Sequence, residues 1–397
     1  MSGSKLGDIA ADAGLARVHI VAWRDLDDPE AGGSELHAAR VAELWADAGI
    51  DVTMRTSAVP GGPEVVDRDG YRVERRLGRY SVFPGVAASG LVGRARRWAR
   101  DGAAQGVGEG DGLVEVWNGM PFFSPLWHGG PRSVWLHHVH GRMWRMVLSP
   151  AVLGHLGEAL ERRVAPPFYR RTPVVTLSES SRREIVEVLR IPPGNISVVP
   201  PGVEPRFTPG GVRSPRPLVA GVGRLVPVKH FDVLVDVLAR LRRRHPDLEA
   251  VIAGEGYERP ALEARVRAVG ADGWLRMPGR VDDDALVGLY RSAWVVAAPT
   301  SHEGWGMTLT EAAACGTPAV ATRIPGHADA VEDGRTGLLV DGPAGLEAGL
   351  DSLLGDASRR ERMGRAARDR AAALTWEETA RRTLLVLAAD ARARSGR

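Results

Sequence analysis

Short apolar runs alternate with amphipathic stretches along most of the chain. Runs such as Val18–Trp23 and Leu218–Val222 hold few polar residues, which is typical of strands buried on both faces. Other stretches, such as Phe231–Arg243, have apolar residues at helical spacing and predict helices packed on one side. Strands that alternate with helices favour parallel sheets, because a parallel connection needs a crossover. The pattern therefore predicts an α/β fold.

The predicted elements form two halves, separated by the proline- and glycine-rich segment Val199–Pro215. Two comparable α/β halves favour paired Rossmann-like, doubly wound domains that face a cleft. We assign residues 17–205 to the first domain, 206–372 to the second, and a basic helix near Trp376–Ala393 to the stretch 373–397. In the first half the pattern predicts strands at Val18–Trp23, Ile50–Thr53, Leu113–Val116, Val134–His137 and Val174–Leu177, and helices over Ser34–Asp47, with Ser34 as N-cap, and Arg183–Leu189. In the second half it predicts strands at Leu218–Val222, Glu249–Ala253 and Trp294–Ala298, and helices at Phe231–Arg243, Ala261–Val269, Asp284–Arg291 and Glu311–Ala314.

Composition narrows the class of protein. The chain has 397 residues, 44% of them apolar and 25% charged, as is ordinary for a soluble globular protein of two domains. A net charge of +3 is too small to argue for nucleic-acid binding. The one cysteine, Cys315, cannot form an internal disulfide, which fits a reducing cytoplasm. No apolar run is long enough to predict a membrane span. Met1–Gly14 is expected to be a loose terminus, and Asp101–Gly112 a surface loop.

Residues 303–311 carry the strongest chemical signal and read Glu-Gly-Trp-Gly-Met-Thr-Leu-Thr-Glu. Gly304 and Gly306 prevent a helix from starting before about Met307, so Glu303 lies in a loop. Glu311 then lies about one turn inside a helix that ends at Gly316. The main-chain N–H groups at the start of that helix, from Gly306, Met307 and Thr308, form an anion site. Two carboxylates beside an anion site indicate a ligand with phosphate and hydroxyl groups.

A second signal follows the strand predicted at Leu218–Val222. Arg224 and Lys229 lie in a glycine-bearing turn, where both cations can converge on a diphosphate. The turn does not fit a dinucleotide fingerprint, because Val226 stands where a third glycine is needed. Gly32-Gly33 forms a similar strand-to-helix turn in the first half, and this signal is weak by itself.

Three histidines, His137, His138 and His140, lie at the end of the strand predicted at Val134–His137. A metal site is disfavoured, because strand alternation separates His137 from His138 and no carboxylate or cysteine lies nearby at ligand spacing. Strand geometry lets only one of the two face the cleft, and we expect it to be His137.

These motifs resemble the E-x7-E signature of the retaining glycosyltransferases of family 4, which have the GT-B fold. The resemblance is specific mainly over residues 218–340. It implies that Glu303 lies by the donor sugar and that Glu311 binds the ribose. It also implies that Arg224 and Lys229 neutralise the leaving nucleotide diphosphate. One of His137 and His138 corresponds to the histidine that the family has beside the reacting sugar. The remaining positions implied at the donor are Gly33, Gly279, Arg280, Val281, Gly304, Trp305, Gly306, Met307 and Thr308.

On this resemblance the first domain binds the acceptor, the second binds the donor, and the terminal helix crosses back to the first domain. We expect a retaining hexosyltransferase that uses a nucleotide-diphosphate sugar and an unidentified hydroxyl acceptor, without metal, cofactor or nucleic-acid partner. It is expected in the cytoplasm, with peripheral contact at the inner membrane surface as a further option. The enzyme alternatives are a nucleotide-sugar epimerase or a sugar phosphorylase. A third alternative is a protein that binds anionic surfaces through the basic runs Arg94–Arg97 and Arg242–Arg244. The mechanism we expect is front-face substitution, in which the acceptor attacks on the face of the sugar that the diphosphate leaves. The chemical alternative is that Glu303 acts as a nucleophile.

Overall fold

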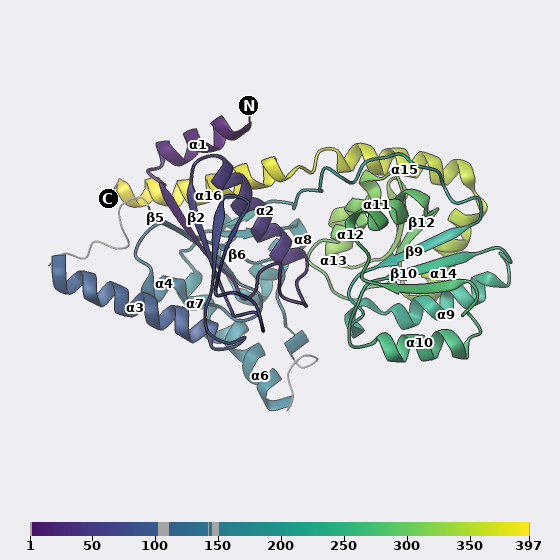
Figure 1. The fold of residues 1–397 in the computed structure, drawn as a ribbon, viewed down its shortest axis with the longest axis horizontal. Coiled ribbons are helices and arrows are strands. Elements are labelled where there is room, and N and C mark those ends of the chain that lie inside the picture. Colours follow the sequence, from purple (N-terminus) through teal and green to yellow (C-terminus); the bar gives the residue numbers. More distant parts are fainter. Residues whose placement is uncertain (1, 102–110, 142, 145–150, 397) are drawn as a thin grey trace. The chain divides into compact units, whose positions relative to one another are not determined.

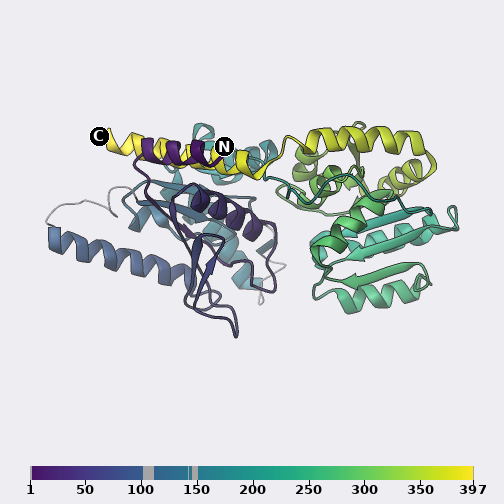
Figure 2. The same ribbon diagram turned by 45° about the horizontal axis from the view of Figure 1, so that its top comes forward.

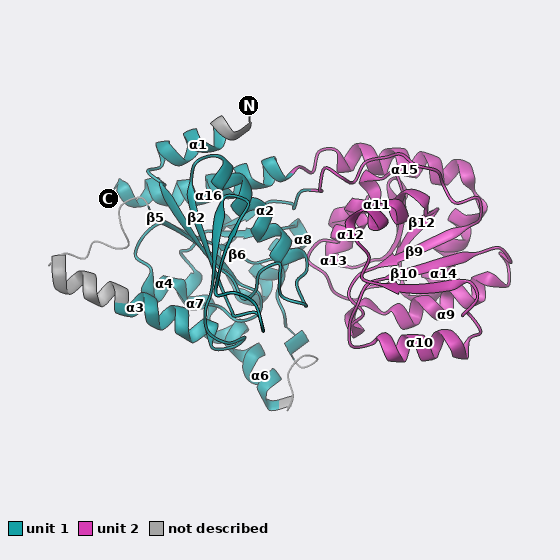
Figure 3. Ribbon diagram, in the orientation of Figure 1, with its two compact units in different colours: residues 1–202, 376–397 teal, residues 203–375 magenta. Residues whose placement is uncertain are grey.

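The computed structural model describes residues 2–101, 111–141, 143–144 and 151–396. These residues form two compact units (Figure 3). Unit 1 holds the chain up to Gly202 together with the last segment from Trp376, and unit 2 holds Val203–Thr375. The last helix of the sequence therefore belongs to the unit that the chain builds first.

Unit 1 is built on an eight-stranded sheet of order β3-β4-β2-β1-β5-β6-β7-β8 (Figure 1). All neighbouring strands are parallel except β3 and β4, which form an antiparallel hairpin. The strands are β1 (Arg17–Val21), β2 (Asp51–Thr56), β3 (Val65–Arg68), β4 (Tyr71–Arg75), β5 (Asp111–Val116), β6 (Arg132–Trp135), β7 (Val174–Thr176) and β8 (Ile196–Val198). The helices are α1 (Ser2–Asp12), α2 (Gly33–Asp47), α3 (Val82–Asp101), α4 (Ser124–Trp127), α6 (Ala151–Ala159), α7 (Pro166–Tyr169), α8 (Glu179–Glu184) and α16 (Trp376–Ser395), with π-helical turns at Leu160–Val164 and Ile185–Leu189.

Helices α1, α2 and α16 cover one face of this sheet. Helices α1 and α16 run side by side although they come from opposite ends of the chain (Figures 1 and 2). Leu384 and Leu387 of α16 are completely buried, in one cluster with Ile20 and Val52 of the sheet. Trp45 of α2 lies in the same cluster, and its indole N–H donates to the carbonyl of Ala380 at 3.0 Å. Helix α16 is therefore part of the core of unit 1.

Unit 2 is a six-stranded, fully parallel sheet of order β11-β10-β9-β12-β13-β14. Apolar strands such as β10 match the runs in the sequence, because helices bury the sheet on both faces. The strands are β9 (Leu218–Val222), β10 (Glu249–Ala253), β11 (Leu275–Gly279), β12 (Val295–Ala298), β13 (Ala319–Thr322) and β14 (Gly337–Val340). The helices are α9 (Phe231–Arg242), α10 (Arg259–Ala268), α11 (Asp283–Ser292), α12 (Met307–Ala314), α13 (Pro325–Ala330), α14 (Gly342–Gly355) and α15 (Ala357–Ala371).

Several local predictions need correction. The segment expected to be a loose terminus forms α1, because Leu6 and Ala10 pack into the core of unit 1. Gly32, not Ser34, is the N-cap of α2, and its N–H donates to the carboxylate of Glu35 at 2.8 Å. The strand expected to reach His137 ends at Trp135. Most of the loop expected at Asp101–Gly112 lies outside the described residues, and so do the side chains of the basic run Arg94–Arg97.

Candidate functional site

The candidate donor site in unit 2 lies where the strand order reverses. Strand β9 is flanked by β10 on one side and by β12 on the other, so the connections that leave β9 and β12 diverge. Because every strand is parallel, the loops after all of them emerge at one edge of the sheet. Arg224 and Lys229 follow β9, Glu303 follows β12, and Arg280 follows β11. The topology therefore gathers most of the residues predicted from sequence on one edge.

Glu303 is held by two cationic or hydrogen-bonding side chains from neighbouring loops. Its Oε1 accepts from Nζ of Lys229 at 3.0 Å, and its Oε2 lies 3.3 Å from Nε2 of His327. His327 is completely buried, and its Nδ1 lies 2.9 Å from the main-chain oxygen of Thr322. Both ring nitrogens thus lie within hydrogen-bond distance of an oxygen atom. Three loops, after β9, β12 and β13, are joined through one carboxylate.

The electrostatic balance keeps Glu303 ionised. Burial alone would raise the pKa of this carboxyl group, but the charge of Lys229 and the hydrogen bond from His327 outweigh burial and hold the pKa well below its usual value. A carboxylate with both oxygens engaged and a depressed pKa is a weak base and a weak nucleophile. The geometry therefore favours an electrostatic and positioning role for Glu303.

Three glycines allow these loops to approach each other at the level of the main chain. A Cβ atom on Gly254 would lie 1.9 Å from the oxygen of Gly223, and one on Gly256 would lie 2.2 Å from the oxygen of Leu225. A Cβ on Gly326 would lie 2.1 Å from the oxygen of Glu303. No side chain can occupy these positions without moving a loop. Gly254 and Gly256 therefore have a packing role, because each allows close contact with the loop after β9.

Glu311 lies about one turn inside α12, as the sequence predicted. Its Oε2 accepts a hydrogen bond of 2.8 Å from the buried hydroxyl of Tyr290. Burial raises the pKa of Glu311 to about 7, although the hydrogen bond from Tyr290 opposes this shift. Glu311 is therefore poised to change its protonation state when a ligand supplies hydrogen-bond donors.

The start of α12 has the geometry of an anion site. Gly306, at φ +123°, precedes Met307, the first residue of the helix, so the first-turn N–H groups have no partner within the helix. Met307 and Thr308 are half-buried, whereas Gly304, Trp305 and Gly306 are buried. The indole N–H of Trp305 has no hydrogen-bond partner among the described residues. Trp305 is thus buried beneath the loop, while Met307 and Thr308 lie nearer to solvent.

Of the remaining donor-side candidates, the two arginines are exposed and Gly279 is buried. Arg224 is exposed and makes no ion pair with any described residue, which leaves its guanidinium available to a ligand. Arg280 is exposed and Val281 half-buried, immediately after β11. Gly279, at φ +88°, lets the main chain turn at the end of β11.

In unit 1 the glycine turn after β1 is shaped by Glu35. The carboxylate of Glu35 accepts from the N–H of Gly32 and from the hydroxyl of Ser34, and pairs with the buried Arg24 at 3.2 Å. Gly33 is exposed at the first position of α2. The side chain of Asn118, after β5, donates to Ser34 at 3.3 Å. The turns after β1 and β5, adjacent strands at the reversal of this sheet, are therefore in contact.

The histidines after β6 occupy different environments. His137 is buried, and its Nε2 lies 3.2 Å from Nδ1 of His37 on α2. Burial lowers the pKa of His137 to about 4, so the ring is neutral at neutral pH. Its Nδ1 is buried without a hydrogen-bond partner among the described residues. His138 is half-buried and stacks on His140, with ring centroids 4.7 Å apart.

Buried Glu161 fixes the turn that carries these histidines. Its carboxylate accepts from the N–H groups of His140 and Gly141 at 2.8 and 2.9 Å, and from the indole N–H of Trp144 at 3.0 Å. Sequence reasoning missed Glu161, His37, Tyr290 and His327. Each acts through contacts that are distant in sequence, so spacing carries no signal for them. Within the described residues, no group of three potential metal ligands gathers.

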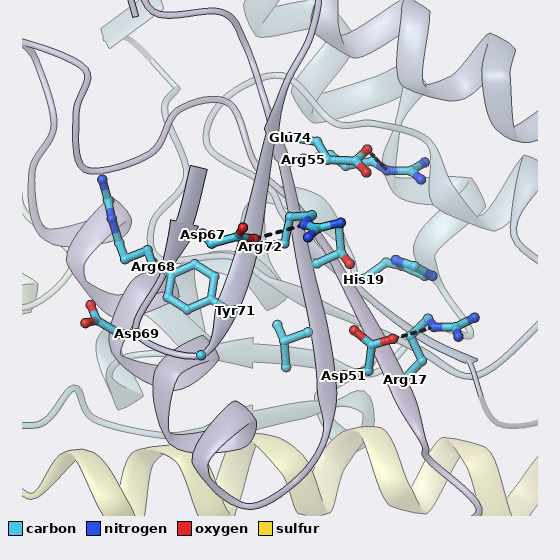
Figure 4. A pocket seen from close by; sticks show the side chains of 13 residues that line it. Arg17, His19, Asp51, Arg55, Asp67, Arg68, Asp69, Tyr71, Arg72 and Glu74 are labelled. Carbon is cyan, nitrogen blue, oxygen red and sulfur yellow. Dashed lines mark hydrogen bonds and ion pairs between the residues drawn. The ribbon is translucent and has the colours of Figure 1, made fainter. Parts of the chain in front are cut away.

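A separate hollow of about 740 Å³ lies on the face of β1, β2 and β4 in unit 1 (Figure 4). Three ion pairs line it: Arg17 with Asp51 at 2.9 Å, Arg72 with Asp67 at 2.9 Å, and Arg55 with Glu74 at 3.3 Å. Since these side chains pair among themselves and none is a predicted site residue, we assign no chemistry to this hollow.

The two units, each a largely parallel sheet covered by helices, have the architecture of the GT-B class of α/β proteins. Comparison with known families agrees. A family model described as "Glycosyl transferases group 1" matches residues 206–370, and one described as "Glycosyltransferase Family 4" matches residues 31–207. The chain belongs to the family 4 glycosyltransferases, and it is a glycosyltransferase that uses a nucleotide-sugar donor.

Full-length relatives and solved structures extend this result. A D-inositol 3-phosphate glycosyltransferase of Kribbella flavida is 31% identical, over 94% of this chain and 96% of its own length. The sucrose-phosphate synthase of Thermosynechococcus elongatus has the same fold, with a TM-score of 0.76 and 20% identity over 92% of this chain and 97% of its own. The Anabaena protein HepE, solved in complex with UDP-glucose, has a TM-score of 0.70 and 16% identity over 96% of this chain and 100% of its own.

The raised pKa of Glu311 yields a test by proton linkage. If ribose hydroxyls donate to Glu311, they stabilise its ionised form and lower its pKa, so binding releases protons near pH 7. Affinity for a nucleotide sugar should therefore fall as the pH is lowered from 8 to 6. Calorimetry in buffers of different ionisation enthalpy measures the release. Glu311→Gln is the matched control and should abolish it, and equal release from both proteins would contradict this role for Glu311.

Proposed function

We propose that the protein transfers a sugar from a nucleotide-diphosphate sugar to a hydroxyl acceptor with retention at the anomeric carbon, by front-face substitution. The observation that supports this most directly is the Lys229–Glu303–His327 network at the reversal point of unit 2. The exposed Arg224 lies in the same loop as Lys229 and makes no ion pair with a described residue. The bond between the anomeric carbon and the diphosphate oxygen breaks. The acceptor oxygen forms its bond on the same face of the sugar, and its proton passes to the departing phosphate.

Each donor-side group has a role in this proposal. Arg224, Lys229 and the N–H groups at the start of α12 stabilise the charge that develops on the diphosphate. Glu311 accepts hydrogen bonds from the ribose, and the loop with Gly279, Arg280 and Val281 holds the base. Glu303 keeps Lys229 in place and lies by the donor sugar. Gly33 contributes a main-chain N–H from the glycine turn of unit 1.

The acceptor is the least defined part of the reaction. Curated relatives act on D-inositol 3-phosphate according to their names, so this compound is the first acceptor to assay. UDP-glucose is the first donor to assay, because it occupies a neighbour of the same fold. Formation of free nucleotide diphosphate only when acceptor is present would separate transfer from epimerisation or hydrolysis.

The two cations should contribute mainly to binding of the diphosphate. Arg224→Ala and Lys229→Ala each remove a charge-assisted contact, on the order of 1.5–3 kcal/mol. Calorimetry should show affinity for nucleoside diphosphate falling by more than about tenfold, with nucleoside affinity unchanged. Arg267→Ala, at an exposed position on α10, is the matched control. Unchanged diphosphate affinity in both site variants would remove the assignment of the donor site.

We propose that no metal or cofactor takes part, because side chains and a helix N-terminus can neutralise the diphosphate. Turnover should then be the same in excess EDTA as in magnesium or manganese. Loss of activity in EDTA that either metal restores would overturn this part of the mechanism.

His137 is proposed to contact the reacting sugar through Nδ1, the buried nitrogen that lacks a partner, while His37 orients the ring through Nε2. A neutral imidazole can accept or donate one hydrogen bond to a sugar hydroxyl. His137→Ala should lower kcat by about 10²–10⁴-fold with donor affinity retained. His138→Ala, at the partly exposed neighbour, is the matched control and should change kcat little. The reverse pattern would assign the role to His138.

Peripheral contact with the inner membrane surface also belongs to this proposal, together with a cytoplasmic site of action. It is supported by the exposed side chains of Val152, Leu153, Leu156 and Arg163 in unit 1.

A further inference from the structure

Helix α6 presents its apolar side chains outward and its glycines inward. Val152, Leu153 and Leu156 are 65%, 45% and 60% exposed, whereas Gly154 and Gly157 are buried. A Cβ atom on Gly157 would lie 2.7 Å from the ring of Trp144, so only glycine lets the helix close on that ring. The usual arrangement of a globular helix, with apolar residues inside, is thus inverted. Helix α6 also projects from the body of unit 1 (Figure 1).

Further exposed apolar side chains follow in the same stretch. Val164 and Phe168 are 49% and 42% exposed, so that five of the fourteen most exposed large apolar side chains in the described part of the chain lie within residues 152–168. Such a concentration marks an interaction surface rather than scattered exposure.

The charges exposed along this stretch all have one sign. Its two acids, Glu158 and Glu161, are buried. Glu158 pairs with Arg162. The carboxylate of Glu161 accepts hydrogen bonds from main-chain and indole N–H groups. The exposed charged side chains between residues 152 and 171 are Arg162, Arg163, Arg170 and Arg171. The stretch 152–171 therefore exposes apolar side chains and cations, while both of its own carboxylates are buried.

We propose that this surface, formed by Val152, Leu153, Leu156, Val164, Phe168 and the four arginines, binds the surface of an anionic lipid bilayer. Apolar side chains enter the boundary between headgroups and acyl chains, and arginines bind lipid phosphates. A symmetric contact with a second copy of the chain would bring like charges together, which disfavours it. None of the helices in the described residues could span a bilayer, so the contact is at the surface only.

The residues on which α6 packs also contact the turn that carries the candidate histidines. Trp144, which packs against Gly157, donates to Glu161, and Glu161 also holds the turn after His137. This part of the inference rests on the proposed function: docking through α6 would bring the acceptor-side turn to the bilayer, where a lipid-linked hydroxyl acceptor could be reached.

Co-sedimentation with vesicles tests the proposal. The full-length protein should bind phosphatidylcholine vesicles that contain phosphatidylglycerol, and bind pure phosphatidylcholine weakly. The double variant Leu153→Glu/Leu156→Glu should lower this partition by at least about tenfold, because it places two charges in the interface. Val65→Glu/Val212→Glu, at exposed apolar positions elsewhere, is the matched control and should bind as the wild type does. Arg163→Ala/Arg171→Ala should weaken binding and its salt dependence, whereas Arg267→Ala/Arg276→Ala should not.

Thermal unfolding and affinity for UDP-glucose are measured on every variant, so that loss of membrane binding is distinguished from loss of the fold or of the donor site. Absence of binding by the wild type to anionic vesicles would overturn the proposal, and so would unchanged binding by the Leu153/Leu156 variant. Sedimentation velocity provides the third decisive outcome. If the wild type self-associates but does not bind vesicles, and the Leu153/Leu156 variant is monomeric, the surface is a contact between copies of the chain. That result would contradict the membrane assignment.

Discussion

The ion pair between Lys229 and Glu303, completed by His327, is the interaction on which the donor side of unit 2 depends. A carboxylate removed from water needs compensating partners, and here they come from the loops after β9 and β13. The glycines at 254, 256 and 326 are a consequence of the same constraint, because the loops must approach at main-chain distance before the side chains can meet. His327 engages one oxygen of Glu303 and Lys229 the other, so both carboxylate oxygens have a partner.

Unit 1 uses buried acids differently. Glu115 accepts from the N–H groups of Phe122 and Ser124 and from the hydroxyl of Tyr169. Glu161 does the same for the turn after β6. Neither acid pairs with a cation, and burial raises the pKa of both. Their hydrogen bonds hold main-chain turns of unit 1 in place.

Local patterns in the sequence were enough to predict much of the fold. Strands β9 and β10 have the predicted bounds, and the start of α12 at Met307 follows from Gly304 and Gly306. The β3–β4 hairpin was missed, although Asp69-Gly70 between its strands is a known hairpin signal, and both residues have positive φ. Strand β3 alternates exposed and half-buried residues and so has a weak apolar pattern. The turn residues were therefore the better evidence for the hairpin.

Contacts between distant residues set the limit of the sequence analysis. His37 meets His137 across 100 positions, and His327 meets Glu303 across 24. Ser34 has the chemistry of an N-cap, but the helix begins one residue earlier, and the N–H of its N-cap Gly32 donates to the carboxylate of Glu35. Which side chain wins such a competition depends on Arg24, whose position is set by the tertiary fold.

The placement of α16 in the core of unit 1 has a consequence for synthesis of the chain. Unit 2 is continuous in sequence and is complete once residue 375 has emerged from the ribosome. The core of unit 1 lacks Leu384 and Leu387 until the last residues are made. Unit 1 is therefore begun before unit 2 and completed after it, and its sheet face stays partly uncovered until α16 has been made.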